Sequence, residues 1–146
     1  MHIELRDTGF NPWEELQRYQ NDVLGQTSKH GATASFVGTM RDVNEGEPVH
    51  GMMLEHYPGM TEKHLQEISE QAKKQWDIID TLIIHRVGQL QPNDPIVLIA
   101  VWSAHRGEAF AACRYLIEEL KSRAPFWKKE GVTGTTRWVR HNTPAA

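Results

Sequence analysis

The sequence has little cysteine and no long apolar run. Its 146 residues include one cysteine, Cys113, so the chain alone can form neither an internal disulfide nor a zinc site built from cysteines. No stretch approaches the roughly 18 apolar residues that a membrane-spanning helix needs. Residues 1–6 also lack the apolar core of a signal peptide. These absences predict a cytoplasmic protein that does not span a membrane.

Metal-binding and nucleotide-binding motifs are missing as well. The eight histidines show neither the H-E-x-x-H spacing nor a compact cluster, so we expect no metal site. The motifs G-x-S-x-G, G-x-x-x-x-G-K-[ST] and G-x-G-x-x-G are absent. Their absence removes the usual signatures of a serine hydrolase, a P-loop enzyme and a dinucleotide-binding enzyme. We therefore expect no bound cofactor.

Basic residues are scarce overall but concentrated near the end of the sequence. The formal net charge is −3, so the protein is not expected to bind nucleic acid. Between residues 121 and 141 there is one acid, Glu130, against six bases, which are Lys121, Arg123, Lys128, Lys129, Arg137 and Arg140. This local excess suggests an anionic ligand, although a solvated tail would have the same composition.

The remaining pattern is that of one globular domain. Hydrophobic residues make up 39% and charged residues 24% of the chain, which is typical of soluble domains of this size. Asn11 and Pro12 have the positions of an N-cap and a first helical residue, and Gly25 is suited to a helix end. Apolar spacing predicts further helices at 60–76 and 107–123, and strands at 32–40, 49–57, 78–90, 96–102 and 132–140. This mixed order predicts a single α+β domain over residues 1–146, with helices packed on a mixed, largely antiparallel sheet.

Two finer predictions follow from the apolar positions. The strands at 78–90 and 96–102 are separated by a Pro-Asn-Asp-Pro turn, so they should pair as an antiparallel hairpin. The first helix should bury Trp13, Leu16, Val23 and Leu24, and the last should bury Ala109, Cys113, Leu116, Ile117 and Leu120. A thiol on that inward face should be inert rather than a nucleophile.

Lys121 continues the apolar stripe of the last predicted helix. It follows Ile117 by four residues and Cys113 by eight, so its stem faces inward. Burying an ammonium is costly, and the amine could reach water along a packed stem instead. If the amine is held at the edge of a pocket, its pKa falls and it can act as a base or nucleophile.

His105 and Arg106 lie where the apolar strand ends and the last helix begins. Backbone N–H groups at a helix N-terminus favour an anion, and the two side chains add directional donors suited to phosphate. A histidine that caps the helix beside an arginine in a surface ion pair would give the same pattern.

Two loops could supply further ligand contacts. Pro125 should end the last helix, after which Phe126 and Trp127 anchor a loop that returns Lys128 and Lys129 towards the helix end; a Lys-Lys-Glu run alone is usually solvated surface. Arg41 follows a strand within a loop bounded by Gly38 and Gly46, where it could point into a cleft. Many surface loops share that second pattern.

Several segments occur in an order found in one family. They are Gly31-Ala32, 36–41, 44–46, Val49, Glu55, Tyr57, Met60, 85–90, His105-Arg106, Ala109-Phe110, Leu120-Lys121 and 124–130. Over nearly its whole length the chain resembles the large, catalytic subunit of molybdopterin synthase. The resemblance implies an α/β hammerhead fold and a homodimer that binds two small ubiquitin-like subunits, forming a heterotetramer. It also implies that the partner's Gly-Gly thiocarboxylate tail delivers sulfur to cyclic pyranopterin monophosphate in two transfers, which make the molybdopterin dithiolene.

The resemblance also assigns roles by position. It implies that Lys121 is the main catalytic residue and that Lys128 stabilises negative charge or assists proton transfer. The substrate-contacting positions that it implies are Thr39, Met40, Arg41, His105, Arg106, Lys121, Lys128, Lys129 and Glu130. His105 and Arg106 should meet the phosphate, and some positions should serve the site of the neighbouring subunit. Two alternatives remain at this point: a docking module for a Gly-Gly tail without chemistry, and an unrelated enzyme acting on a phosphorylated metabolite.

Overall fold

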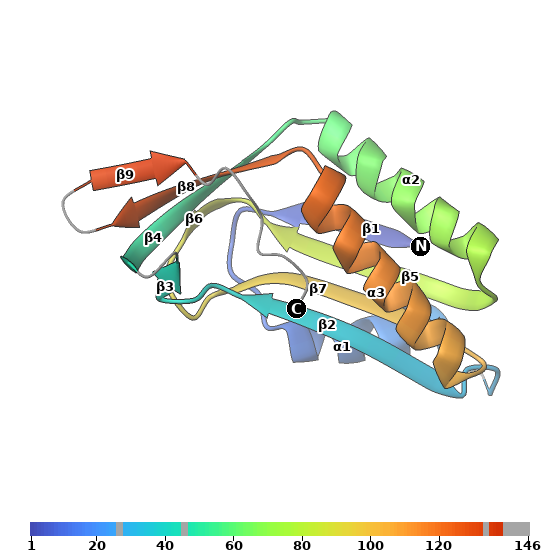
Figure 1. Cartoon of the computed structure of the whole chain (residues 1–146). Helices are drawn as coiled ribbons and strands as arrows, with labels where there is room; N and C mark the ends of the chain where they lie inside the picture. The colour runs from blue at the N-terminus through green and yellow to red at the C-terminus, as the bar shows by residue number, and fades with distance from the viewer. Residues whose placement is uncertain (26–27, 45–46, 133–134, 139–146) are drawn as a thin grey trace.

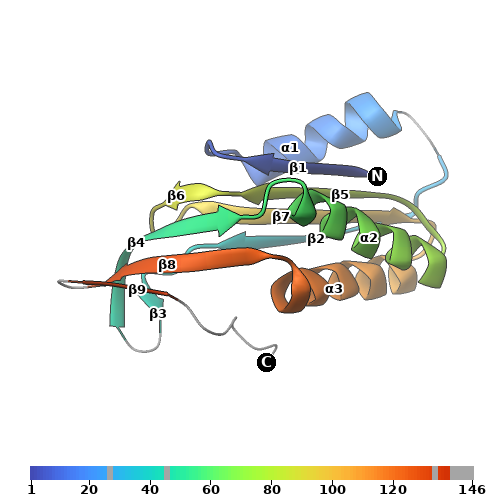
Figure 2. The same cartoon turned by 90° about the horizontal axis from the view of Figure 1, so that it is seen from above.

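The computed structural model of the chain has three layers and describes residues 1–25, 28–44, 47–132 and 135–138. A central four-stranded sheet carries helices α2 and α3 on one face and helix α1 on the other (Figures 1 and 2). A second sheet, of five strands, continues beyond one end of the central sheet. The predicted α+β class is confirmed. Within the described residues, no helix has the length and apolarity needed to cross a membrane.

The central sheet has the strand order β1-β5-β7-β2. Its strands are β1 (His2–Arg6), β5 (Ile78–Arg86), β7 (Pro95–Ser103) and β2 (Ala32–Thr39). Strand β1 is parallel to β5, whereas β5 and β2 both run antiparallel to β7. The predicted hairpin is confirmed by the pairing of β5 with β7, in which Ile83 lies opposite Ile99. Both strands are almost entirely buried, because helices cover the two faces of the sheet.

This second sheet was not expected. Its strands are β3 (Val43–Asn44), β4 (Glu47–His56), β6 (Gly88–Leu90), β8 (Phe126–Val132) and β9 (Thr135–Trp138). The prediction of one strand over 78–90 is wrong in detail, because Gly88 has a φ of 86° and divides the segment between the two sheets. The prediction of a loop after Pro125 is also wrong, since β8 pairs with β4 from Phe126 to Val132. The start of the last predicted strand lies in β8, and residues 139–140 lie outside the described part.

Helix α1 (Pro12–Tyr19) begins as predicted. The Asn11 side chain accepts hydrogen bonds from the backbone N–H groups of Trp13, at 3.0 Å, and Glu14, at 3.4 Å. Its buried face differs from the prediction: Trp13 and Val23 are exposed, while Tyr19 is buried and donates to Asp80 at 2.7 Å. A π-helical turn at Gln20–Leu24 (η1) changes the residue spacing after Tyr19, so the 3.6-residue pattern no longer places Val23 inward.

Helices α2 (Met60–Gln75) and α3 (Arg106–Arg123) form the main core with the central sheet. The inward residues predicted for the last helix are all buried, and they are Ala109, Cys113, Leu116, Ile117 and Leu120. Burial raises the pKa of the Cys113 thiol to about 11, which agrees with the prediction of an inert thiol because little thiolate forms near neutral pH.

Gly31 holds the connection into β2 against the start of α3. Its N–H donates to the Ser103 carbonyl at 3.0 Å, and a Cβ at this position would collide with the Ala104 carbonyl oxygen. We expect Gly31→Ala to lower the free energy of unfolding by about 1–3 kcal/mol, because backbone must move to relieve the collision. Urea denaturation would measure the change. Gly107→Ala is the matched control, because no atom lies within 4 Å of its added Cβ; an equal loss in both variants would contradict the assignment.

Candidate functional site

A narrow cavity of about 20 Å³ lies at the end of α3, where β8 turns back along β4. That volume is enough for about one water molecule. The cavity is lined by two amines, one imidazole and four apolar groups, from Leu54, His85, Leu120, Lys121, Ala124, Phe126 and Lys128. The structure therefore brings together both lysines that the resemblance marks as catalytic.

The local sequence explains how the two lysines meet. Lys121 lies in the last turn of α3, and Ala124 ends the helix just before Pro125. The Thr61 hydroxyl donates to the Pro125 carbonyl at 3.0 Å and ties this turn to α2. Strand β8 then runs antiparallel to β4, with Lys128 in register with Leu54. Seven residues after Lys121, the chain has thus returned to the same cavity.

The Lys121 amine has unusual acidity. Burial is the main cause and the neighbouring Lys128 charge is the second; together they lower the pKa of Lys121 from 10.5 to about 8. About a tenth of the amine is therefore unprotonated at pH 7, far more than for an ordinary lysine. The unprotonated amine can accept a proton or attack an electrophile, whereas a second ammonium beside it can stabilise developing negative charge.

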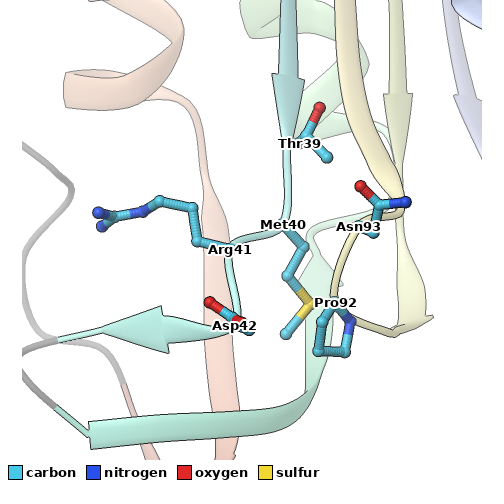
Figure 3. Close-up of a pocket in the computed structure, with 6 residues that line it drawn as sticks. All are labelled: Thr39, Met40, Arg41, Asp42, Pro92 and Asn93. Atoms are coloured by element: carbon cyan, nitrogen blue, oxygen red, sulfur yellow. The ribbon is translucent and has the colours of Figure 1, made fainter.

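Thr39, Met40 and Arg41 lie at a different, wider cavity of about 580 Å³. Asp42, Pro92 and Asn93 complete its lining, and Figure 3 shows Arg41 pointing away from Met40 and Pro92. Backbone hydrogen bonds hold the two segments together. The Met40 N–H donates to the backbone carbonyl of Asp94 at 2.9 Å, and the Asn93 N–H donates to the backbone carbonyl of Met40 at 2.8 Å. Asn93 adopts a φ of 76°, which closes the turn over β2.

Of these three residues, Met40 is the buried one. Its side chain is 6% exposed and belongs to an apolar cluster with Met52, Leu54, Leu90 and Ile96. Met40 thus supports the floor of the wider cavity, while Thr39 and Arg41 are exposed. Leu54 belongs to the same cluster and lines the narrow cavity, so the two cavities flank one apolar cluster.

His105 and Arg106 lie at the other end of α3. Fifteen residues separate Arg106 from Lys121 on one helix, which corresponds to about 22 Å. Both side chains are exposed, and His105 makes no side-chain cap. The buried Ser103 hydroxyl holds the junction instead, accepting from the His105 N–H at 3.2 Å and donating to its carbonyl at 3.0 Å. Within one chain these two residues do not reach the lysine cavity.

Lys129 and Glu130 continue along β8, where their backbones pair with Met53 and Met52. Their side chains lie outside the described part of the structure. Among the described residues, no group of three or more His, Cys, Asp or Glu side chains converges as it would around a metal ion.

Sequence reasoning missed His85 as a site residue. It lies near the end of β5, where an apolar run gives no sign that one polar ring faces a cavity. Phe126 was expected only as an anchor, yet its ring stacks on His85 with 4.1 Å between centroids and 15° between planes. No signal in the sequence pairs these two residues, because their contact depends on β8 lying beside β4.

Comparison with known proteins gives a consistent result. The model of the MoaE protein family matches residues 11–123. A molybdopterin synthase catalytic subunit from Ralstonia nicotianae is 62% identical over 75% of this chain and 62% of its own length. One from Pseudomonas aeruginosa is 46% identical over 95% and 90%. A solved molybdopterin biosynthesis MoaE protein from Burkholderia ambifaria superposes with a TM-score of 0.80 at 42% identity, covering 99% of this chain and 92% of that one.

Proposed function

This chain belongs to the MoaE family of molybdopterin synthase catalytic subunits, and from that premise we propose that Lys121 and Lys128 carry its sulfur-transfer chemistry. The observation behind the proposal is the convergence of both amines on one narrow, mostly apolar cavity. A docking surface for a peptide tail would not need two amines close enough to lower the pKa of one of them. An enzyme that moves sulfur between two carbon atoms has a use for both.

The sulfur donor is the thiocarboxylate at the Gly-Gly end of a small ubiquitin-like subunit, and the acceptor is cyclic pyranopterin monophosphate. In each of two transfers, a carbon–sulfur bond forms at a pterin carbon in place of a carbon–oxygen bond, whose oxygen leaves as water or with the phosphate, and the acyl–sulfur bond of the donor is then hydrolysed. The acyl carbon takes an oxygen from water, so the partner leaves as a carboxylate. Lys121, unprotonated, accepts a proton in this sequence, and the Lys128 ammonium stabilises the negative charge on the reacting oxygen or sulfur.

The phosphate of the substrate is bound by cations outside the narrow cavity. Arg41 is exposed and lies at the wider cavity, across the apolar cluster from the lysines. His105 and Arg106 are too far along α3 to join the same site within one chain, so they serve the site of a second copy in a homodimer. With one small subunit on each copy the assembly is a heterotetramer. Thr39, Lys129 and Glu130 complete the substrate contacts, and Met40 supports the floor beneath them.

We place the reaction in the cytoplasm. The single cysteine is a buried free thiol, which suits a reducing compartment. Sulfur arrives on the partner, so the catalytic chain needs no reactive thiol of its own.

Reconstitution tests the function directly. The purified chain is mixed with cyclic pyranopterin monophosphate and a thiocarboxylated Gly-Gly-ended small subunit, and the dithiolene product is measured. We expect product only when all three are present. No product despite binding of the small subunit would favour a docking module, whereas neither product nor binding would favour an enzyme acting on another phosphorylated metabolite.

The rate of transfer should depend on pH through Lys121. The pKa of its amine is lowered to about 8, so the active unprotonated form is scarce below that pH and dominates above it. We expect the single-turnover rate to rise about tenfold per pH unit below 7 and to level off above 9. Rates measured between pH 6 and 10 with saturating donor would show this rise and plateau. A profile that is flat or falls across pH 7–9 would contradict the base role of Lys121.

A further inference from the structure

The His85 ring faces the lysine cavity from the central sheet. It is 2% exposed and lies on β5, while Lys121 comes from α3 and Lys128 from β8. Three nitrogen bases from three separate elements therefore share one cavity of about 20 Å³. The proposed chemistry uses two of them and leaves the imidazole without a role.

The orientation and tautomer of His85 are fixed by two contacts. Its Nδ1 lies 2.7 Å from the backbone carbonyl oxygen of Arg86. A carbonyl can only accept, so Nδ1 carries the proton and Nε2 has the lone pair. The second contact is with the Phe126 ring, which stacks on the imidazole with 4.1 Å between the ring centroids. The ring can neither flip nor tilt without losing one of these contacts.

The surroundings also keep the imidazole uncharged. Burial is the largest cause, and the charges of Lys121, Lys128 and His56 add to it, so the pKa of His85 falls to about 3. Only the hydrogen bond to Arg86 acts in the other direction. Because the pKa of His85 lies well below that of Lys121, moving a proton from Lys121 to His85 would be strongly unfavourable. His85 is therefore not a proton relay.

On the premise of the proposed function of Lys121 and Lys128, we propose that His85 is a positioning residue of the sulfur transfer: its uncharged ring, held by Phe126 and the Arg86 carbonyl, closes the lysine cavity against water on the β5 side. A flat ring without charge can pack against two amines where an apolar side chain of another shape would leave a gap. A positively charged residue there would repel both lysines, and a negatively charged one would raise the pKa of Lys121 by stabilising its ammonium.

The His85 ring that forms this wall of the cavity should also affect the pKa of Lys121. Burial is the main cause of the lowered Lys121 pKa, so removing part of the wall admits water and should return that pKa towards 10.5. At neutral pH, each unit of increase lowers the unprotonated fraction of the amine about tenfold. Raising the pH should restore that fraction and with it the rate.

The test compares His85→Ala with His85→Phe. The Lys121 pKa is read by NMR from protein labelled with ¹³C at the lysine ε-carbon, with the signal assigned by its loss in Lys121→Met. This readout needs neither donor nor turnover, so it stands even if the proposed function fails. We expect His85→Ala to raise the Lys121 pKa by one unit or more, and His85→Phe, which keeps the stacked wall, to hold it within about half a unit of wild type.

Activity gives the second readout. In His85→Ala the transfer rate at pH 7 should fall about tenfold and recover at pH 10, whereas a loss from general unfolding would not recover. His64→Ala is the matched control, because His64 is a partly buried histidine on α2 that does not line the cavity. If His85→Ala does not fold, His85→Asn replaces it, since it keeps a donor for Arg86 and removes the stack. An unchanged Lys121 pKa in the folded Ala or Asn variant, or an equal rise in His85→Phe, would overturn the proposal.

Discussion

Lys121→Ala should reduce sulfur transfer by a factor on the order of 10³ or more, while the small subunit still binds. General acid–base catalysis by one positioned side chain contributes about 10²–10⁴-fold, and this variant removes the amine that the proposed mechanism uses as its base. Single-turnover product formation measures the first effect, and the affinity for the thiocarboxylated partner measures the second. The expected change is therefore in the rate constant rather than in binding.

The control for this variant comes from another helix. Lys74 is an exposed lysine in the last turn of α2, so Lys74→Ala removes the same charge from an equivalent helical position without touching the cavity. It should leave the rate unchanged. A rate within a factor of about two of wild type in Lys121→Ala would remove Lys121 from the catalytic role, because such a change corresponds to less than about 0.5 kcal/mol of barrier.

Lys121→Met separates catalysis from stability. The lowered pKa means that the folded protein disfavours the ammonium, so the unfolded chain binds more protons between pH 8 and 10.5 and stability rises with pH across that window. Methionine removes the buried charge and fills the space of the stem. We expect an inactive protein that is more stable at pH 7 by about 1–3 kcal/mol, since one pKa unit equals about 1.4 kcal/mol and the amine keeps some contact with water.

The sequence predicted the central part of the fold well because that part obeys local rules. The Asn11-Pro12 start, the stripe of α3 and the β5–β7 hairpin each depend on residues close together in the chain. The second sheet depends on pairing between β4 and β8, whose partners lie seventy or more residues apart in the chain. The Phe-Trp-Lys-Lys-Glu run alternates too weakly to predict a strand, because its backbone partners come from β4 rather than from its own neighbours.

In the site, too, the sequence predicted what depends on neighbouring residues and not what depends on pairing between distant strands. Lys121 stood out because a cation interrupted an apolar stripe, and the proline after it predicted a return of Lys128 to the helix end. The sequence could not show that His85 and Phe126 stack there, since the two residues belong to strands of different sheets. The helix predicted over 107–123 is confirmed as α3, and its unbroken run sets the distance between Arg106 and Lys121.

That distance leads to the second large effect. If His105 and Arg106 of one copy bind the phosphate of the substrate that reacts at the lysines of the other copy, the double variant His105→Ala/Arg106→Ala should lose activity by about 10²-fold or more, through lost charge stabilisation. Lys121→Ala should be inactive for a separate reason. A hybrid dimer of the two variants then has one site with all residues intact and one site with both defects. It should show about half of the wild-type turnover per dimer.

Hybrid dimers can be isolated by expressing the two variants together with different affinity tags and purifying through both. The control hybrid pairs Lys121→Ala with Lys128→Ala. Both lysines line one cavity within a single chain, so each site of that hybrid keeps one defect and activity should not recover. Recovery in the first hybrid but not in the second would place His105 and Arg106 across the dimer from the lysines. Failure of both hybrids, with dimers shown to be intact, would mean that His105 and Arg106 act in the site of their own chain, against their placement across the dimer. Full activity of the double variant itself would mean that the phosphate is bound without these two residues, which leaves Arg41 as the exposed cation at the edge of the wider cavity.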